Sequence, residues 1–504
     1  MNYSKNYISL LLSLKVLREK DMHCQKSYNQ LFQKSSVLSL IAVMIIIFSE
    51  SLISAQPLTL QQAIATAIQN NNTYKAALLK VEENRYKVRE SWGMLWPQLS
   101  TDVAYTRQWY EAGFQSQIAG QYDVKIINGQ IAVNPGAFYN SLQASRNGYI
   151  ASEYEARSIK ANTIITTLRL YYQVLLTKEL ITMHEEALKA LEENLRIVTV
   201  GYQKGTFSKL DFLRAKVAYN NEKTQLINAK NDYLTVCATF NIQLNRDINE
   251  PVILDESVLM VRNDDLQYLS LEEEKEIALI KELVALSLKN RPELLQLTHS
   301  KKALEYASDA AASVYLWPSL FVSGNYGTSK SISKEGSQFQ PTGNLTIDHI
   351  LEAMSQGMSE SFAPKGWNDH WMITFGATYQ WGALSPINSS HAKAKELESQ
   401  ANQLDLQLED FVKSVRLDIQ RGFLKLKSAS NSIYSQQGNV ETAEESLKTA
   451  TAQFRNGIID NSKFLESNVA LIQAKTLYIQ ALYDYKVSQA ELNKSIGVDY
   501  FKLY

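Results

Sequence analysis

Histidines are the residues best suited to acid–base or metal chemistry in this chain. Those beyond the N-terminal segment are scattered, and their spacing matches no metal-binding motif: His184, His299, His349, His370 and His391. Asp369 and His370 are adjacent, but we expect them in a loop, as a chance pair. The spacing therefore predicts no metal site.

The cysteines add no further chemistry. Cys24 lies in the N-terminal segment, and Cys237 falls in an apolar helical stretch, where we expect a small buried side chain. Two such distant cysteines predict no disulfide framework. Glycine-rich phosphate loops, nucleophile elbows and Cys–His pairings are also lacking from the sequence. We therefore expect no enzymatic activity and no cofactor.

Charge and composition narrow the possible partners. The 504 residues carry a formal net charge of −1, and the segment before Ala55 contributes +3, which leaves −4 on the remainder. A weakly acidic body gives no electrostatic reason to expect nucleic acid as a partner. With only 20 glycines and 9 prolines, long uninterrupted elements are permitted.

The N-terminal segment is typical of a secretory signal. Lysines precede a run without charge from Ser35 to Ser49, and small residues follow as far as Ala55. The run is too short to span a bilayer, which takes about 20 residues. We expect 1–55 to be a signal sequence, removed on export, and Cys24 to be removed with it. An exported chain without a helical anchor belongs to the periplasm, the medium or an outer-membrane barrel.

The chain contains an internal duplication. A shift of 252 residues places Tyr202 on Phe454, Gly205 on Gly457, and Phe212 on Phe464. The front halves match as well, since Leu95-Trp96-Pro97 resembles Leu316-Trp317-Pro318. We expect a first repeat over 56–245, a linker or side element over 246–277, a second repeat over 278–497, and a tail over 498–504.

Each repeat predicts the order helix, strand, strand, long helix, return helix. The long helices are expected over 140–202 and 388–455, and both carry coiled-coil spacing: Leu188, Leu191, Leu195 and Val198, then Val440, Ala443, Leu447 and Ala450. At about 1.5 Å per residue each spans roughly 95–100 Å. In the first repeat, one helix over 60–94 and a return helix over 208–245 would together match that length. Such elongated antiparallel pairs do not suit a compact enzyme.

Four segments predict strands of an outer-membrane barrel. Apolar and polar residues alternate from Gln98, from Ser319 and from Trp371, with aromatic residues at the ends. The remaining strand, near Tyr122–Val133, is less clear, because Asn128-Gly129 is also typical of a hairpin turn. Residues 331–368 are expected to form an external loop that contains a short helix near 350–354. Residues 111–121 are expected to form a shorter loop.

In this organisation the chain resembles the TolC-like outer-membrane efflux proteins. The resemblance is carried by Leu58–Ala65, Asn290–Glu293, the two Trp-Pro pairs and the two glycine turns. It implies a mostly α fold with a transmembrane β-barrel portion: a homotrimer with a shared twelve-strand barrel and a periplasmic tunnel of twelve helices. It also implies an exit duct in the outer membrane of a Gram-negative bacterium, surrounded by lipid. Its implied partners are a periplasmic adaptor and an inner-membrane pump of RND or ABC type.

The number of strands per chain also predicts an oligomer. Four strands cannot close, and an open sheet edge in lipid leaves backbone groups unpaired. The smallest outer-membrane barrels have about 8 strands, so several chains must combine. A soluble periplasmic coiled-coil adaptor or tether is the alternative, because it would share the helices although not the strands.

Two turns and two junctions are candidate functional sites. Lys204-Gly205-Thr206 and Asn456-Gly457-Ile458 should cap the long helices through a left-handed glycine. By resemblance they are also the tips where the adaptor docks. Trp96-Pro97 and Trp317-Pro318 should lie where helix becomes strand, because proline cannot continue a helix and tryptophan suits a bilayer interface.

The resemblance further implies a ring of acids at the periplasmic mouth, six and nine residues after the second tip glycine. Those positions hold Lys463 and Glu466, with Asp460 one turn earlier. Three copies of Lys463 would partly cancel the field of three Glu466 carboxylates. Asp211, the matching position of the first repeat, is a candidate tether to a neighbouring helix. Alternatively, these residues form a solvated first turn of a helix.

Overall fold

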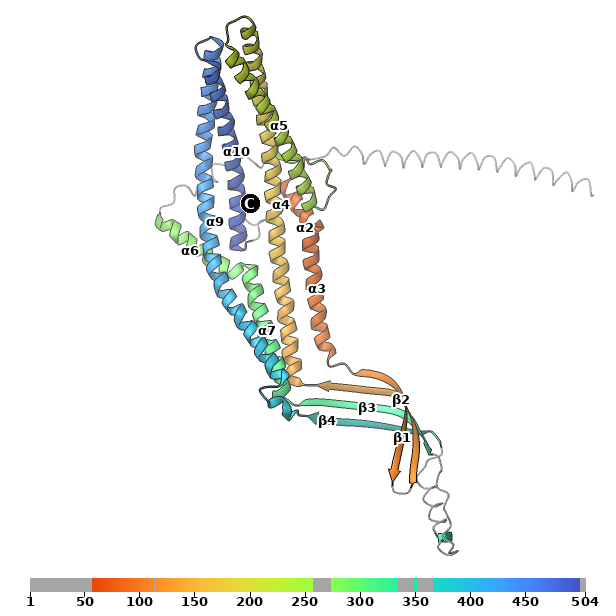
Figure 1. Ribbon diagram of the computed structural model, residues 1–504. Helices are drawn as coiled ribbons and strands as arrows, with labels where there is room; N and C mark the ends of the chain where they lie inside the picture. Colours follow the sequence, from red (N-terminus) through yellow and green to blue (C-terminus); the bar gives the residue numbers. More distant parts are fainter. Residues whose placement is uncertain (1–56, 113–114, 257–272, 334–347, 351–365, 499–504) are drawn as a thin grey trace, which may run out of the picture. The chain divides into compact units, whose positions relative to one another are not determined.

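Helices dominate the computed structural model, which describes residues 57–112, 115–256, 273–333, 348–350 and 366–498 (Figure 1). The predicted signal sequence lies outside these residues, as do 257–272 of the linker and most of the 331–368 connection. The elements in chain order are α2 (Leu60–Asn70), α3 (Asn72–Gly93), β1 (Gln98–Ala112), β2 (Gln115–Val133), α4 (Pro135–Gln203), α5 (Lys209–Gln243), α6 (Glu273–Asn290), α7 (Pro292–Leu316), β3 (Ser319–Ser333), β4 (Asn368–Thr378), η3 (Trp381–Leu384), α9 (Ser389–Arg455) and α10 (Asn461–Ile496).

Contacts within the chain separate two units. The described part of the smaller one consists of 57–59 and Pro251–Asp255. These two segments are joined by a parallel bridge between Leu58 and Leu254, beside which the Leu58 amide donates to the Ile253 carbonyl at 2.8 Å. The larger unit holds all the helices and strands named above.

The order of elements in the larger unit repeats. Helix α3 is followed by β1, β2, α4 and α5, and α7 by β3, β4, α9 and α10. With 69 and 67 residues, α4 and α9 are each about 100 Å long at ~1.5 Å per residue. Helices α2, α3 and α5 pack along α4, and α10 packs along α9, whereas α7 packs against both long helices (Figure 1).

Two local features differ from the sequence prediction. The single helix expected over 60–94 is two helices, because Asn71 adopts an extended conformation. Its side chain accepts from the Tyr74 amide and so caps α3. Helix α6 begins at Glu273, inside the predicted linker over 246–277, since a first turn rich in acids is favourable at a helix N-terminus.

The predicted heptad positions contribute to a core between the helices. Leu191 and Val198 of α4 are buried, and Leu195 packs on the cluster of Val198, Ala215, Phe454 and Phe464. A second cluster joins α9 and α10 through Ile419, Leu426, Tyr485 and Leu492, and α6 packs against it. Burial at 3- and 4-residue spacing on both partners explains why these long helices pair side by side.

The strands form a four-stranded antiparallel sheet in the order β1-β2-β3-β4. Asn128 and Gly129 pair with Ser100 and Leu99 on one side and with β3 on the other, so they lie inside β2 and do not form the alternative hairpin turn. The pairing shifts between Lys125 and Ile127, which makes Ile126 a bulge residue.

Two of the loops expected from the sequence are also wrong. Strand β1 continues to Ala112 and β2 starts at Gln115, so most of the predicted 111–121 loop is strand. Strand β4 starts at Asn368, which places Asp369 and His370 in the sheet, where they pair with Thr328 and Gly327. Of the short helix expected near 350–354, only Ile350 lies within the described residues, in helical conformation.

Candidate functional site: helix tips, groove and sheet

Both long helices end in the same glycine turn. After Lys204 caps α4, Gly205 adopts φ +77°, and the Thr206 amide donates to the Gly201 carbonyl at 2.8 Å. After Asn456 caps α9, Gly457 adopts φ +70°. There the Ile458 amide donates to the Gln453 carbonyl at 2.9 Å. In both turns the amide after the glycine donates to the carbonyl five residues earlier. This hydrogen bond is typical of helices that end in a left-handed residue, a conformation that favours glycine.

The two tips are packed against each other. The Phe454 ring lies 5.7 Å from the Phe207 ring and 5.5 Å from the Phe464 ring, measured between centroids. Beside them, the buried Asn194 side chain donates from Nδ2 to Asn461 Oδ1 at 2.8 Å. Asn461 belongs to the second repeat and Asn194 to the first. An aromatic cluster and a buried amide pair therefore hold the two tips of the chain together.

The candidate constriction residues lie on the first turns after the tips. The Lys463 ammonium is 2.9 Å from a Glu466 carboxylate oxygen, and both side chains are about 70% exposed (68% and 71%). Asp460 is the N-cap of α10, where its side chain makes no capping bond to the described residues. The Asp211 carboxylate accepts from the Ser208 amide and hydroxyl, forming a capping box on α5. Asp211 thus caps its own helix.

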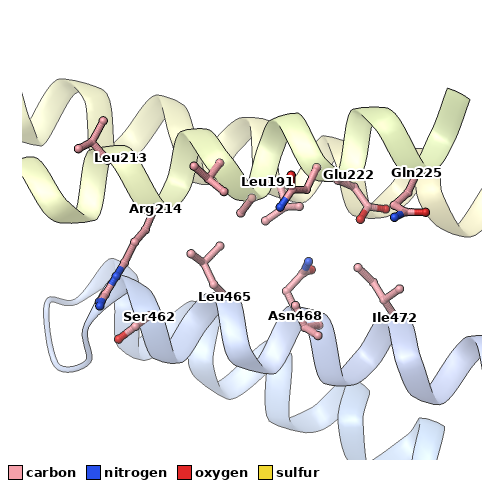
Figure 2. Close-up of a pocket in the computed structure, with 13 residues that line it drawn as sticks. Leu191, Leu213, Arg214, Glu222, Gln225, Ser462, Leu465, Asn468 and Ile472 are labelled. Atoms are coloured by element: carbon pink, nitrogen blue, oxygen red, sulfur yellow. The ribbon is translucent and has the colours of Figure 1, made fainter.

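A groove near the tips runs between α5 and α10, with Leu191 of α4 in its floor (Figure 2). Its volume is about 530 Å³, and most of its lining is apolar. Glu222 lines it, and its carboxylate accepts a hydrogen bond from His184 Nδ1 at 2.7 Å. Asn468 also lines it, almost fully buried, with Nδ2 unpartnered among the described residues. Glu222 and Asn468 could not be predicted from the sequence, because they lie on α5 and α10, two helices far apart in the chain.

One face of the sheet is apolar and exposed. The register places Val322 between Ile131 and Phe375, and Tyr326 between Ile127 and Trp371. Phe375 and Trp371 are about three-quarters exposed (76% and 74%), as is Val103 of β1 (74%). The opposite face carries polar residues in the neighbouring rows, among them Gln98, Gln130, Ser323 and Thr374. A sheet that is apolar on its exposed face suits contact with lipid.

Tryptophans gather where the helices meet the sheet. Trp96 and Pro97 lie between α3 and β1, and Trp317 and Pro318 between α7 and β3. Both tryptophans are exposed, as is Trp381 of η3 after β4. Trp381 is followed by Gly382 and so lacks the Trp-Pro pattern that identified the other two junctions. Exposed tryptophans at one end of an apolar sheet are typical of a membrane–water interface.

The structure offers no centre for covalent or metal chemistry among the residues it describes. No group of His, Cys, Asp and Glu side chains there is arranged to hold a metal ion. Cys237 is buried as predicted, and burial raises the pKa of its thiol, which disfavours the reactive thiolate. None of the described helices combines the length and apolar character needed to cross a bilayer.

Solved structures share this fold. The chain superposes with a TM-score of 0.70 on the outer membrane channel CmeC of Campylobacter jejuni, at 16% identity over 87% of this chain and 85% of that one. The outer membrane channel MtrE of Neisseria gonorrhoeae gives a TM-score of 0.65, at 18% identity over 87% and 89% of the two chains. These likenesses confirm the mostly helical, TolC-like fold.

Sequence comparison identifies the family. The toluene efflux pump outer membrane protein TtgC of Pseudomonas putida is 22% identical over 455 residues, which is 88% of this chain and 84% of that protein. The model of the outer membrane efflux protein family matches residues 63–239 and 283–498. This chain therefore belongs to the outer membrane efflux protein family.

Proposed function

We propose that the chain is one protomer of a homotrimeric channel in the outer membrane, the passive exit duct of a tripartite efflux system. The observation that carries the proposal is the described four-stranded sheet, in which β1 and β4 are the edge strands and one face is apolar and exposed. Free edges in lipid would leave backbone amides and carbonyls unpaired. Three copies, edge to edge, close a twelve-strand barrel above a tunnel of twelve helices.

Helix α5 supports the same assembly. Apolar side chains with coiled-coil spacing are exposed along it: Leu210, Leu213, Val217, Ile227 and Leu234. Such a stripe needs a partner helix, and a neighbouring protomer provides one. The alternative, a soluble adaptor or tether, does not explain the apolar sheet face, because that face would be exposed to water. Resistance of the membrane-bound protein to carbonate extraction would distinguish the two.

Assembly can be tested directly. Purified in mild detergent, the protein should have the mass of a trimer, and its band should shift to the monomer position on gels only after heating, because the barrel closes only between chains. A monomer that inserts stably into the outer membrane on its own would contradict the proposal.

The tips are the proposed docking surface for the periplasmic adaptor, which connects the duct to an inner-membrane pump of RND or ABC type. Gly205 and Gly457 support this role, because no atom lies within 4 Å of a Cβ built at either position. A partner helix can therefore approach the backbone closely. Ile458 adds an exposed apolar contact beside the second glycine.

The proposed constriction is formed by Asp460, Lys463 and Glu466, three of each in the trimer. Because Lys463 pairs with Glu466 at 2.9 Å, each protomer offers a nearly cancelled pair and one further carboxylate, that of Asp460. Lys463→Asp should therefore strengthen cation selectivity and block by divalent cations, while Glu466→Ala should weaken both. Planar-bilayer recordings measure these effects.

A matched control uses an exposed glutamate that also pairs with a lysine of its own helix, but far from the tips. Glu83 of α3 pairs with Lys87 at 2.7 Å, so Glu83→Ala removes the same charge away from the tips. Its conductance should equal that of the unmodified protein. Unchanged selectivity in both constriction variants would show that these residues form only a solvated first turn.

A further inference from the structure

A histidine and an aspartate meet across the sheet on its polar face. His370 Nε2 of β4 lies 3.8 Å from Asp123 Oδ1 of β2, although β3 separates the two strands. Asp123 Oδ1 is buried and has no hydrogen-bond partner among the described residues. The His370 side chain is 40% exposed and the Asp123 side chain 29% exposed. A carboxylate oxygen left unsatisfied beside an imidazole can accept a hydrogen bond from the ring N–H.

Gly327 makes this approach possible. On β3 it pairs with Lys125 on one side and with His370 on the other. Strands two positions apart are separated by about 9.6 Å, so a side chain on the middle strand would stand between the two groups. Because glycine has none, the imidazole can reach over β3 toward β2.

Two further charges share this face. The register places Asp102 opposite Lys125, and Lys125 lies two residues from Asp123. The Asp102 carboxylate also accepts from Asn128 Nδ2 at 2.8 Å, which holds it on the polar face. Three other charged residues of the strands, Arg107, Lys330 and Asp369, fall on the opposite face by the same alternation.

We propose that Asp102, Asp123, Lys125 and His370 form a charged girdle inside the barrel that makes ion selectivity depend on pH. The proposal rests on the trimeric channel proposed above, whose lumen the polar face would line. With neutral imidazole the girdle carries −1 per protomer, and with imidazolium it carries none. Imidazole is the side chain that changes charge between about pH 5 and 8. Acidification should therefore weaken the preference for cations.

Bilayer recordings in a KCl gradient test this. Between pH 8 and pH 5.5, the ratio of cation to anion permeability should fall about twofold or more, because three negative charges are neutralised at one level of the pore. In His370→Gln this pH response should disappear. In Asp123→Asn, the cation preference at pH 8 should fall toward the value that the unmodified channel shows at pH 5.5.

Two controls make the same chemical changes elsewhere. Asp369→Asn alters the neighbour of His370 on the other face of the sheet. His299→Gln alters a helical imidazole whose pKa is lowered by burial and by nearby Lys302. Both should keep the unmodified response. A conducting trimer whose pH response survives in His370→Gln, or whose cation preference at pH 8 is unchanged in Asp123→Asn, would overturn the girdle alone. A trimer without any conductance would overturn the channel and the girdle with it.

Discussion

Replacing both tip glycines with tryptophan is expected to abolish export while the trimer still reaches the outer membrane. Gly205 and Gly457 are the left-handed residues of the two turns, and the space around each is open. A bulky side chain there would occupy the volume that a docked adaptor helix must fill. Disruption of a central interface position costs about 2 kcal/mol or more, which is roughly a thirtyfold loss of affinity.

Conformational strain must be separated from steric block at these tips. A residue with a Cβ in left-handed conformation costs roughly 1–2 kcal/mol, but asparagine adopts it more readily than most. Gly457→Asn should therefore keep the turn and most of the export. Gly438→Trp places the same bulk on α9, where a Cβ also meets no atom within 4 Å.

Export from cells that lack the native protein, together with the heat-labile trimer band, gives the readout for this series. Loss of export in the double tryptophan variant, with a normal trimer and with export retained in Gly438→Trp, is the expected result. Full export by the double variant would show that the adaptor does not dock at the tips.

Gly327→Val is expected to prevent the sheet from forming, and with it the trimer. A Cβ at Gly327 would lie 2.4 Å from the Val124 carbonyl oxygen and 3.0 Å from the Lys125 Cα. These are backbone atoms beside the Ile126 bulge, and unlike a side chain they cannot rotate away. Overpacking of this kind typically costs about 1–3 kcal/mol, occasionally more, and each chain of the proposed trimer would incur this cost.

Gly324→Val is the matched control on the same strand. A Cβ there has a Met372 carbonyl oxygen at 3.7 Å as its nearest neighbour, an ordinary contact, and the position faces the apolar side of the sheet. The heat-labile trimer should survive in Gly324→Val and be lost or strongly reduced in Gly327→Val. Equal trimer yields from the two variants would contradict the close approach at Gly327.

Much of the helical organisation follows from the sequence by itself. The 252-residue shift aligns the two glycine turns, and both turns have the same backbone geometry in the structure. The long helices expected over 140–202 and 388–455 correspond to α4 and α9 within a few residues. These features were predictable because heptad spacing, glycine caps and helix-stopping prolines act within a few residues along the chain.

Strand β2 shows where local pattern fails. Its apolar face is formed by Tyr122 and Val124 before the bulge, and by Ile127, Ile131 and Val133 after it. The extra residue, Ile126, moves the alternation from even to odd positions, so no single period describes the strand. Only pairing with β1 and β3 decides that register, and it also makes Asn128-Gly129 strand instead of turn.

The contacts between the repeats were decided by the tertiary structure alone. Asn194 meets Asn461 across 267 positions of sequence, and Glu222 and Asn468 come together in one groove. From the sequence, His370 was expected in a loop, as part of a chance pair with Asp369. In the structure it lies in β4, near Asp123, because Gly327 leaves the space between the two side chains open. Spacing along a chain reports periodic neighbours, whereas these pairs depend on which strands and helices the folded core brings side by side.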